Sequence, residues 1–566
     1  MIILGLSAPN HDASAALVSA RGLEAAVEES KLVRSRAFSG VPCLAAQSCL
    51  DQTSLSWPDI SIVAIAGQRR LSRLRQAWLQ TTSNPLGLLR NAFSHAKEIC
   101  RAGPESSSKR FLQGRLSSST AVVCFEHQLC HAASAFYGSP FDRALILTLD
   151  ERGDGLAGTV SIGEGSRIRI LQTIAFPHSI GRVYSQVTRL LGFLPRSEEQ
   201  KTQWLSLQGE PVFENTFVDM LSGSSNGSFR LDLTYFNRHS SNETQFSEKF
   251  YGRIGFAPAK WPKARDEIGP HLACSLQQAC ATVLTRLLQK WRKQLGARNL
   301  CLAGGVFLNA LLVGDLEKSS GFEEIFVQPA SGNAGCSLGA AWLAWHQTLG
   351  NPRLDGLSNV YLGPSFKPGQ IKEVLDNCKA PYRWFRTDEE RNEETVRLLE
   401  AGKIVAWCQG ATEFGPRALG NRSLLASPWA PFVKENLNDY IKHREHFRPF
   451  ALAVPAEDQA QFFDCTRQAA FMTSVGWAKP GAQELAREFL LPRNRVRLHV
   501  VNRESNPSFW TLLKKFGERS PAPFLINASF NMFGEPLVNS PRDAVRSFYC
   551  SGVDALVIGG FLLCKK

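Results

Sequence analysis

Residues 144–162 read ALILTLDERGDGLAGTVSI. A mainly apolar run, 144–149, ends at Asp150, and a second run begins at Gly158 after the turn at Asp154-Gly155. Apolar runs bounded by turn residues are typical of buried β-strands. The stretch therefore predicts two strands joined by a turn, with an aspartate at the end of the first strand.

The same pattern occurs near the N-terminus. Residues 2–6, IILGL, run into the polar turn His11-Asp12-Ala13-Ser14 and then into the apolar residues 15–18. Two strand-turn-strand units, each opening an α/β subdomain, are what an actin/Hsp70-like nucleotide-binding fold would show. In such a fold the nucleotide binds in the cleft between the two halves.

The C-terminal half contains a loop rich in glycine and arginine. Residues 413–423, EFGPRALGNRS, place Arg417 and Arg422 five residues apart between a Gly-Pro turn and a Gly-Asn turn. Arginine favours bidentate recognition of phosphate or carboxylate oxygens, and glycine lets the backbone approach a ligand closely. We expect both guanidinium groups to face one anion.

Two further segments extend this expected anion site. The sequence KHREHFRPF, 442–450, supplies more cations, and NASFN, 527–531, is a short polar turn after an apolar strand. The side chains expected to bind the anion are Arg417, Lys442, Arg448, Asn527 and Ser529.

Length and composition indicate a multidomain globular protein. The 566 residues are 44% hydrophobic, which is too long a chain for one ordinary core and predicts about two to four domains. The Gly-, Pro- and Ser-rich stretch 350–370 marks a domain junction. We find no apolar run long enough to cross a membrane and no leader sequence, so we expect a cytoplasmic protein with no membrane partner.

The net charge of +13 is compatible with nucleic-acid binding, but its distribution favours another interpretation. Many basic residues fall in the expected anion site or in Arg69–Arg115, which is predicted to be a helical insertion. No basic stretch shows the aromatic residues expected of a surface that binds single strands. We therefore expect the positive charge of the protein to serve mainly in binding small substrates that carry phosphate. The fourteen cysteines include no C-x-x-C pair and are expected to be reduced thiols.

Together, EFGPRALGNRS, K-x-R-x-x-F-R-P-F and NASFN resemble the C-terminal signatures of the NodU/CmcH family of O-carbamoyltransferases. That family includes the enzymes that carbamoylate tobramycin, cephamycin and novobiocin. The resemblance implies a TsaD-like domain of the actin/Hsp70 superfamily over 1–352, with two duplicated subdomains, and a YrdC-like α/β domain over 353–566. The second domain would form carbamoyl-adenylate from carbamoyl phosphate and ATP, with Mg(II) accompanying the ATP. The first would transfer the carbamoyl group to a hydroxyl of a small secondary metabolite.

A metal site is expected in the first domain. His127 and His131 stand four residues apart, so on a helix both imidazoles lie on one face and suit one transition metal. The resemblance implies that these histidines, Asp150 and a fourth ligand bind the metal, Fe(II) in the first place with Mn(II) or Zn(II) as alternatives. At the fourth position this chain has Asn333 where the family usually has aspartate. An amide oxygen can bind a cation but adds no charge.

Nucleotide and catalytic residues are expected nearby. A strand over Asn299–Ala303 ends at Gly304-Gly305, and the resemblance assigns Gly304, Gly305 and Asn309 to the adenosine-binding segment. His11 is a candidate general base for the acceptor hydroxyl, because a neutral imidazole accepts a proton readily. Asp232 is a second candidate acid or base.

Two alternatives remain open at this point. One is a tRNA threonylcarbamoyladenosine-forming enzyme, because both fold types also occur in that pathway. The other is a nucleotide-gated binding protein without transfer chemistry, which would need no clustered arginines. The acceptor itself is open among aminoglycosides, β-lactams, polyketides and nodulation factors, and the oligomeric state is equally undetermined by the sequence.

Overall fold

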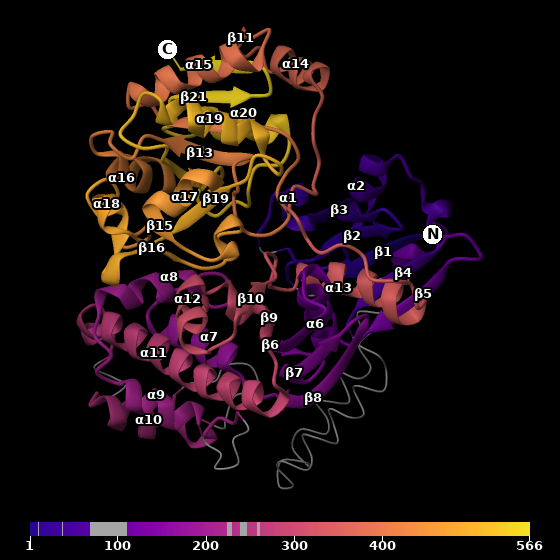
Figure 1. Cartoon of the computed structure of the whole chain (residues 1–566), viewed down its shortest axis with the longest axis vertical. Helices are drawn as coiled ribbons and strands as arrows, with labels where there is room; N and C mark the ends of the chain where they lie inside the picture. The colour runs from indigo at the N-terminus through magenta and orange to yellow at the C-terminus, as the bar shows by residue number, and fades with distance from the viewer. Residues whose placement is uncertain are drawn as a thin grey trace. The chain divides into compact units, whose positions relative to one another are not determined.

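The computed structural model describes residues 1–8, 11–36, 38–67, 110–222, 229–237, 246–256 and 261–565 (Figure 1). Most of the insertion predicted over Arg69–Arg115 lies outside the described residues. The chain divides into two compact units. The first consists of Met1–Leu23, Ser39–Cys43 and Leu55–Gly356, and the second of Glu24–Phe38, Leu44–Ser54 and Leu357–Lys566. Two short segments of the N-terminal region therefore belong to the same unit as the C-terminal region.

The chain opens with a mixed five-stranded sheet of order β3-β2-β1-β4-β5. Its strands are β1 (Ile2–Ser7), β2 (Ser14–Ser19), β3 (Gly22–Glu28), β4 (Ile62–Ala66) and β5 (Ala121–Phe125). Strands β1 and β2 pair antiparallel, whereas β4 runs parallel to both β1 and β5. The strand-turn-strand unit predicted near the N-terminus is thus confirmed as β1 and β2.

A second five-stranded sheet has the order β10-β9-β6-β7-β8. Its strands are β6 (Arg143–Gly153), β7 (Leu156–Glu164), β8 (Arg167–Ala175), β9 (Asn299–Ala303) and β10 (Glu324–Val327). The predicted unit 144–162 forms the antiparallel pair β6 and β7, with Leu145 opposite Ile162. Strand β9 runs parallel to β6 with Leu300 beside Leu145, so Asp150 lies toward the C-terminal ends of both strands.

Two helices of the first unit bring the central site together. Helix α6 (His127–Gly138) packs on β6 and β9, helix α13 (Gly335–Leu343) packs on β1, β2 and β4, and the two helices pack on each other. A side chain at Gly339 would place its Cβ 1.9 Å from the carbonyl oxygen of Cys130. Only glycine permits this approach, which sets the N-terminal turns of α6 and α13 side by side.

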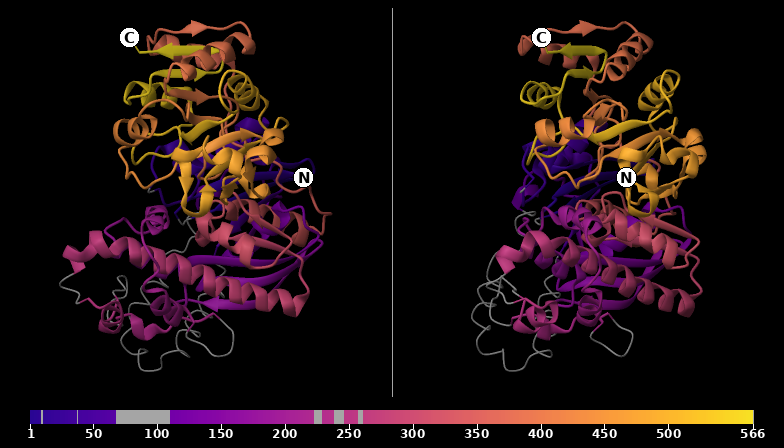
Figure 2. Two further views of the ribbon diagram at one scale, coloured as in Figure 1. Left: turned by 60° about the vertical axis from the view of Figure 1, so that its left-hand side comes forward. Right: turned by 90° about the vertical axis from the view of Figure 1, so that its left-hand side faces the viewer.

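The remaining helices of the first unit cover the second sheet. They include α7 (Ile180–Leu190), α8 (Glu199–Leu205), α9 (Glu214–Leu221), α10 (Glu248–Ile254), α11 (Trp261–Leu295) and α12 (Ala310–Ser319). Helix α11 is the long helix that crosses this unit in Figure 2. Its apolar side chains join those of α7, α9 and β6 in one buried core.

The second unit is built on a mixed eight-stranded sheet of order β11-β22-β21-β12-β13-β20-β14-β19. Its strands are β11 (Arg383–Trp384), β12 (Val405–Cys408), β13 (Arg422–Ala426), β14 (Ala451–Pro455), β19 (Leu498–Val501), β20 (Leu525–Ser529), β21 (Ala555–Ile558) and β22 (Phe561–Cys564). A small sheet has the order β15-β16-β18-β17, formed by Phe463–Asp464, Gly476–Ala478, Arg495–Val496 and Leu490–Leu491.

Helices surround these sheets. They are α1 (Glu29–Val33), α2 (Cys43–Thr53), α14 (Pro368–Asn377), α15 (Asp388–Glu400), α16 (Val433–Glu435), α17 (Ala456–Phe462), α18 (Pro480–Gln483), α19 (Pro507–Gly517) and α20 (Pro541–Tyr549). The arginine-rich loop connects β12 to its antiparallel neighbour β13.

The mixed α/β class is confirmed, whereas the actin/Hsp70-like and YrdC-like assignments stay predictions. Within the described part of the chain, no helix is both long and apolar enough to cross a membrane. The cysteines of the described residues are free thiols, of which Cys301 and Cys408 are buried in strands as expected.

Candidate active site

Two histidines and one aspartate converge in the core of the first unit. His127 and His131 extend from the first turn of α6, and their Nε2 atoms lie 3.1 Å apart. The Oδ2 atom of Asp150, on β6, lies 3.2 Å from His127 Nε2 and 3.6 Å from His131 Nε2. All three side chains are buried. The helical spacing of the two histidines therefore places them as the sequence predicted.

Neighbouring groups fix this arrangement. The backbone N–H of His127 donates to Asp154 Oδ2 at 2.9 Å, which caps the N-terminus of α6. The backbone N–H of Glu151 donates to Asp150 Oδ1 at 2.8 Å. Burial alone would raise the pKa of Asp150, but hydrogen bonds from the two histidines hold it well below its usual range. Burial lowers the pKa of His131, so the pair consists of a carboxylate beside an imidazole that favours its neutral, metal-binding form.

Asn333 and His11 complete the cluster. The Nδ2 atom of Asn333 lies 3.3 Å from His11 Nε2 and donates to the backbone oxygen of His11 at 3.2 Å. A hydrogen bond with Asp12 raises the pKa of His11 to about 9, and the Nδ1–Oδ2 distance of that pair is 3.1 Å. His11 is therefore protonated at neutral pH, which counts against the predicted role as general base.

The donor atoms of this cluster fit a divalent metal. Bonds of about 2.0–2.1 Å to nitrogen and oxygen place neighbouring ligand atoms about 3.0–3.4 Å apart, close to the separations among His127, His131 and Asp150. The Oδ1 atom of Asn333 and the Nδ1 atom of His131 are buried without a hydrogen-bond partner among the described residues. Cys336 adds a thiol whose Sγ lies within 4.8 Å of the histidine nitrogens. The residues present thus suit a transition metal with nitrogen and oxygen ligands.

The predicted nucleotide segment lies beside this cluster. Gly304 follows β9 with φ +100°, a conformation that favours glycine. A Cβ at Gly305 would lie 3.2 Å from Asp150 Oδ1, so this segment runs directly past the carboxylate. Asn309 is buried and caps α12, accepting from the backbone N–H of Leu312 at 3.0 Å. Its amide also donates to Gln277 Oε1 at 2.8 Å, so its hydrogen bonds lie within the fold.

Asp232 makes local contacts. Its side chain accepts from Thr234 and forms an ion pair with Lys249 at 2.8 Å. Burial would raise the pKa of Asp232, but the hydrogen bonds from Lys249 and Thr234 lower it. A carboxylate held in its charged form by a lysine is a weak proton acceptor, so its predicted acid or base role gains no support from these contacts.

Five cations converge in the second unit. Arg417, Lys442, Arg444, Arg448 and Arg497 form what we call the cation cluster. Burial and repulsion from Arg448 lower the pKa of Arg417 to about 10 and that of Arg444 to about 9. Burial lowers the pKa of Arg497 well below its usual range, and the charges that add to this shift are those of Arg417, Arg444 and Arg448. Like charges gathered in this way indicate a site for a multiply charged anion.

Lys442 also connects this cluster to the predicted NASFN turn. Its buried Nζ donates to the backbone oxygen of Ser529 and, at 2.8 Å, to Asn531 Oδ1. Burial and the charges of Arg444, Arg36 and Arg448 lower the pKa of Lys442 well below its usual range. Arg417, Lys442 and Arg448 therefore come together as predicted. Arg444 and Arg497 join them, although the sequence argument did not select them.

The prediction that Arg422 faces the same anion is wrong. Its guanidinium group is buried and donates to the backbone oxygens of Gln409 at 2.7 Å and Asn421 at 3.0 Å. Glu413 stabilises the loop around Arg422. Its Oε1 accepts from the backbone N–H groups of Leu419, Asn421 and Arg422 at 2.8–3.1 Å. Arg422 thus stabilises the loop, and the role of Arg417 in binding an anion stays a prediction.

Helix α1 holds the other end of this loop. Glu28 and Lys31 form a buried ion pair at 2.9 Å. The Oε1 atom of Glu28 accepts from the backbone N–H of Gly415 at 2.7 Å, and Lys31 Nζ donates to the carbonyl oxygens of Glu413 and Gly415. Burial raises the pKa of Glu28. We call this contact the α1 clamp.

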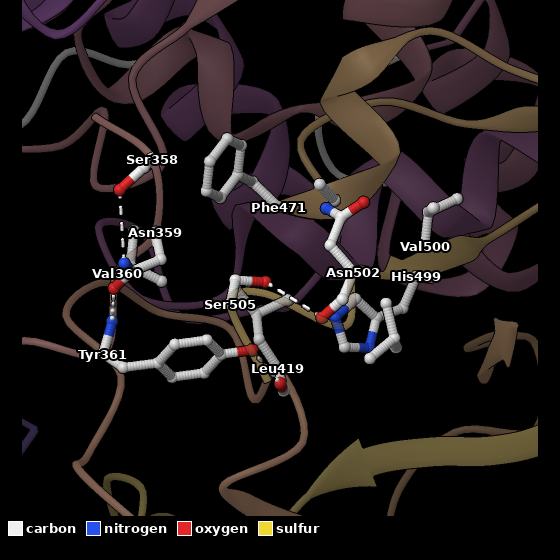
Figure 3. Close-up of a pocket in the computed structure, with 12 residues that line it drawn as sticks. Ser358, Asn359, Val360, Tyr361, Leu419, Phe471, His499, Val500, Asn502 and Ser505 are labelled. Carbon is white, nitrogen blue, oxygen red and sulfur yellow. Dashed lines mark hydrogen bonds between the residues drawn. The ribbon is translucent and has the colours of Figure 1, made fainter. Parts of the chain in front are cut away.

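A small, partly open pocket lies next to the arginine-rich loop (Figure 3). His499, Asn502, Ser505 and Tyr361 point into it, together with Leu419 and Phe471. Burial lowers the pKa of His499 to about 3, so its ring is neutral. The Nδ2 atom of Asn527 lies 3.0 Å from His499 Nδ1 and donates to the backbone oxygen of Ala418 at 3.1 Å. Asn527 thus connects the pocket wall to the residue that follows Arg417.

Comparison with known proteins identifies the family. The model described as "Carbamoyltransferase N-terminus" matches residues 2–342, and the one described as "Carbamoyltransferase C-terminus" matches residues 396–565. The chain belongs to the NodU/CmcH carbamoyltransferase family. It is 33% identical to the uncharacterized protein sll1178 of Synechocystis sp. over 100% of this chain and 96% of that protein.

Two relatives with named functions extend the comparison. Nodulation protein NolO of Bradyrhizobium diazoefficiens is 34% identical over 78% of this carbamoyltransferase and 79% of its own length. The 3'-hydroxymethylcephem-O-carbamoyltransferase of Amycolatopsis lactamdurans is 32% identical over 46% of this chain and 48% of its own length. Among solved structures, full-length HypF in a phosphate- and nucleotide-bound form is 12% identical over 61% of this chain and 46% of its own, with a TM-score of 0.32. That score is too low to support an argument.

Some residues of this carbamoyltransferase had no signal in the sequence. Cys336 stands alone in an apolar segment, and Glu28 and Lys31 lie almost four hundred positions from the loop they hold. Arg444 could have been found, because it lies within the predicted segment 442–450. The roles assigned to His11, Asp232, Gly304, Gly305 and Asn309 stay predictions.

Proposed function

We propose that this carbamoyltransferase uses carbamoyl phosphate and ATP to carbamoylate a hydroxyl group of a small metabolite, by way of carbamoyl-adenylate. The cation cluster of the second unit is the observation that carries the proposal. Cations held close together around a polar turn repel one another, and a multiply charged anion bound among them offsets this repulsion. A dianion such as carbamoyl phosphate, or the phosphates of ATP, would relieve that repulsion and accept charge-assisted hydrogen bonds.

The first step belongs to the second unit. Carbamoyl phosphate, water and ATP would yield carbamoyl-adenylate, phosphate and pyrophosphate. Water forms a bond to the phosphorus of carbamoyl phosphate as the bond from that phosphorus to the carbamate oxygen breaks. The carbamate oxygen then forms a bond to the α-phosphorus of ATP as pyrophosphate leaves. Arg417, Lys442 and Arg448 bind the phosphate charges, and cations fixed in this way stabilise the charge that develops on the leaving groups.

The second step belongs to the first unit. The acceptor hydroxyl oxygen forms a bond to the carbamoyl carbon, the bond to AMP breaks, and the hydroxyl proton is released. Gly304 and Gly305 would let the adenylate approach the backbone beside Asp150. His127, His131, Asp150 and Asn333 would hold a divalent metal, with Fe(II), Mn(II) or Zn(II) all compatible with these ligands. When bound, such an ion polarises a carbonyl group as a Lewis acid.

The relatives support hydroxylated metabolites as acceptors. The names of two relatives describe O-carbamoylation of a hydroxymethyl group on a cephem, and others are nodulation proteins. These names differ in the molecule that is modified, so they support the class of reaction rather than one acceptor.

The test measures pyrophosphate release from ATP with and without carbamoyl phosphate. We expect Arg417→Ala, Lys442→Ala and Arg448→Ala each to reduce carbamoyl-phosphate-dependent release at least about tenfold, because a hydrogen bond to a charged group contributes about 1.5–3 kcal/mol. Arg487→Ala removes an exposed arginine of the same unit and should leave the release unchanged. A wild-type protein that releases no pyrophosphate in response to carbamoyl phosphate would refute the proposed function.

A further inference from the structure

A group of arginines lies beside Asp150 that the proposed reaction does not use. Arg182 and Arg152 both stack on the ring of Phe176, with their Cζ atoms 4.8 Å and 5.3 Å from the ring centroid. Arg196 donates from Nε and Nη2 to the carboxylate of Glu151 at 2.6 and 2.7 Å. We call Arg152, Arg182, Arg189 and Arg196 the α7 arginine cluster.

This cluster is held next to the histidine–aspartate site by short covalent and hydrogen-bonded links. Glu151 and Arg152 directly follow Asp150 on β6. Ser179, the N-cap of α7, donates from its Oγ to the backbone oxygen of Asp150 at 2.9 Å. Arg182 lies in the first turn of α7, three residues after this cap. The charges of Asp150 and Glu151 also contribute to the raised pKa of His11. The arginines therefore border the site where transfer is proposed.

The cluster carries an excess of positive charge. The carboxylates that act on these four arginines are those of Glu151 and Glu199, and Glu151 is already engaged in a bidentate pair with Arg196. Among the described residues, the Arg182 guanidinium makes no hydrogen bond and no ion pair, although it is partly buried. Burial lowers its pKa, and repulsion from Arg152, Arg196 and Arg189 adds to that shift. The N-terminus of α7 adds partial positive charge at the same place.

Stacking on Phe176 makes these guanidinium groups suitable for a planar or tetrahedral oxyanion. Ring contacts restrict the rotation of a long side chain and leave the N–H edge of each guanidinium available. An arginine restricted in this way loses less conformational entropy when it binds an oxyanion. The construction differs from that of an ordinary solvated surface, where arginines pair with neighbouring carboxylates.

We infer that the α7 arginine cluster binds an anionic group, a phosphate or a carboxylate, on the acceptor that receives the carbamoyl group. The inference rests on the proposed function and narrows its substrate class from hydroxylated metabolites to acidic ones. A cationic acceptor would be repelled by the cluster beside Asp150. A neutral acceptor would leave the Arg182 guanidinium without a partner.

The experiment compares four sugars that differ in charge: glucose 6-phosphate, glucuronate, glucose and glucosamine. Binding is measured by calorimetry, and carbamoyl transfer by the mass of the product in the presence of carbamoyl phosphate and ATP. We expect at least one acidic sugar to bind about tenfold more tightly than glucose and to be the preferred acceptor, with glucosamine the weakest. The first two sugars distinguish a phosphate from a carboxylate.

Variants test whether the preference for acidic sugars comes from the α7 arginine cluster. Arg182→Gln should reduce the preference for acidic sugars at least about fivefold, and Arg182→Glu should shift it toward glucosamine. Arg298→Gln is the matched control, because Arg298 is an exposed arginine just before β9, at the end of that strand away from Asp150, and it should keep the wild-type preference. Circular dichroism checks that each variant is folded.

Three results would overturn the inference: glucose bound or carbamoylated as well as both acidic sugars, an acidic preference that survives Arg182→Gln, or competition by AMP that shows the cluster to bind the adenylate instead. Pyrophosphate release by the wild-type protein is measured in the same samples. Its absence would refute the proposed function, whereas its presence without an acidic preference would refute only the inference about the acceptor.

Discussion

Asn333 lies at a position where the charge of the side chain affects both metal binding and the reactivity of the metal. Its Oδ1 atom is buried without a hydrogen-bond partner among the described residues, and its Nδ2 atom lies against His11. A buried unsatisfied oxygen is unfavourable unless a ligand satisfies it. A bound cation would do so, although an amide contributes no negative charge to hold that cation.

Asn333→Asp should therefore tighten binding of divalent metal. The added carboxylate supplies charge and a stronger oxygen ligand, so we expect an increase in affinity of at least about tenfold and better retention during dialysis against a mild chelator. The same charge makes the ion a poorer Lewis acid toward a carbonyl, so carbamoyl transfer should fall as affinity rises. Titration of Mn(II) or Zn(II) into stripped protein measures affinity, and an unchanged constant would show that residue 333 does not face the ion.

His499 allows a prediction about pH. Its pKa is about 3 in the folded protein, compared with about 6.5 in an unfolded chain. Between these values the unfolded state binds a proton that the folded state does not, so stability is lost as the pH falls from about 6.5 toward 3. His499→Gln should make the decrease in the free energy of unfolding between pH 6.5 and 4.5 shallower, by up to about 1.4 kcal/mol per pH unit. Urea unfolding at a series of pH values gives this slope, and parallel curves for both proteins would contradict the prediction.

At the scale of elements, the α1 clamp connects a five-residue helix to the arginine-rich loop. Removing one partner of a buried ion pair leaves an uncompensated charge in the core. Glu28→Gln and Lys31→Met should each lower the free energy of unfolding by about 3–5 kcal/mol. Each should also reduce carbamoyl-phosphate-dependent pyrophosphate release, because Gly415, which the clamp holds, lies two residues before Arg417.

The double variant Glu28→Gln/Lys31→Met distinguishes the loss of stability caused by an unpaired charge from the loss caused by altered packing. It removes both charges, so its stability should exceed that of Lys31→Met alone. Lys372→Met serves as a control, because Lys372 forms an exposed pair with Asp376 on α14 that contributes about 0–1 kcal/mol. If both single variants were as stable as this control, the clamp would have no structural role.

Several elements were predictable because the spacing of residues along the sequence determines which side chains lie on one face of a strand or helix. The apolar runs at 2–6 and 144–149 became strands β1 and β6, and the four-residue spacing of His127 and His131 became one helix face. Arg417 and Arg422 show the limit of such patterns. Both arginines stand in the same motif, yet backbone oxygens occupy Arg422 and leave only Arg417 in the cation cluster, a distinction that depends on where β13 begins.

Contacts between distant parts of the chain were not predictable in this way. The clamp joins Glu28 to Gly415, and Cys336 approaches two histidines of another helix. No local spacing encodes such pairs, because they depend on which strands are neighbours in a sheet. The general base role of His11 stays a prediction, although a hydrogen bond with Asp12 raises the pKa of His11 to about 9.

At the scale of the whole molecule, the two proposed steps fall in different units, which makes them separable. His127→Ala and His131→Ala should lose bound transition metal and carbamoyl transfer, yet should retain carbamoyl-phosphate-dependent pyrophosphate release, because the cation cluster lies in the second unit. Elemental analysis and the pyrophosphate assay measure the two properties. Metal content equal to wild type in both variants would remove the ligand assignment.

The assignment of Glu24–Phe38 and Leu44–Ser54 to the second unit has a consequence for biosynthesis. The ribosome releases Glu28 and Lys31 long before Gly415 exists, since 387 positions separate Glu28 from that glycine. The buried contacts of the α1 clamp can therefore form only after the loop has been synthesised, and contacts of such sequence separation form slowly.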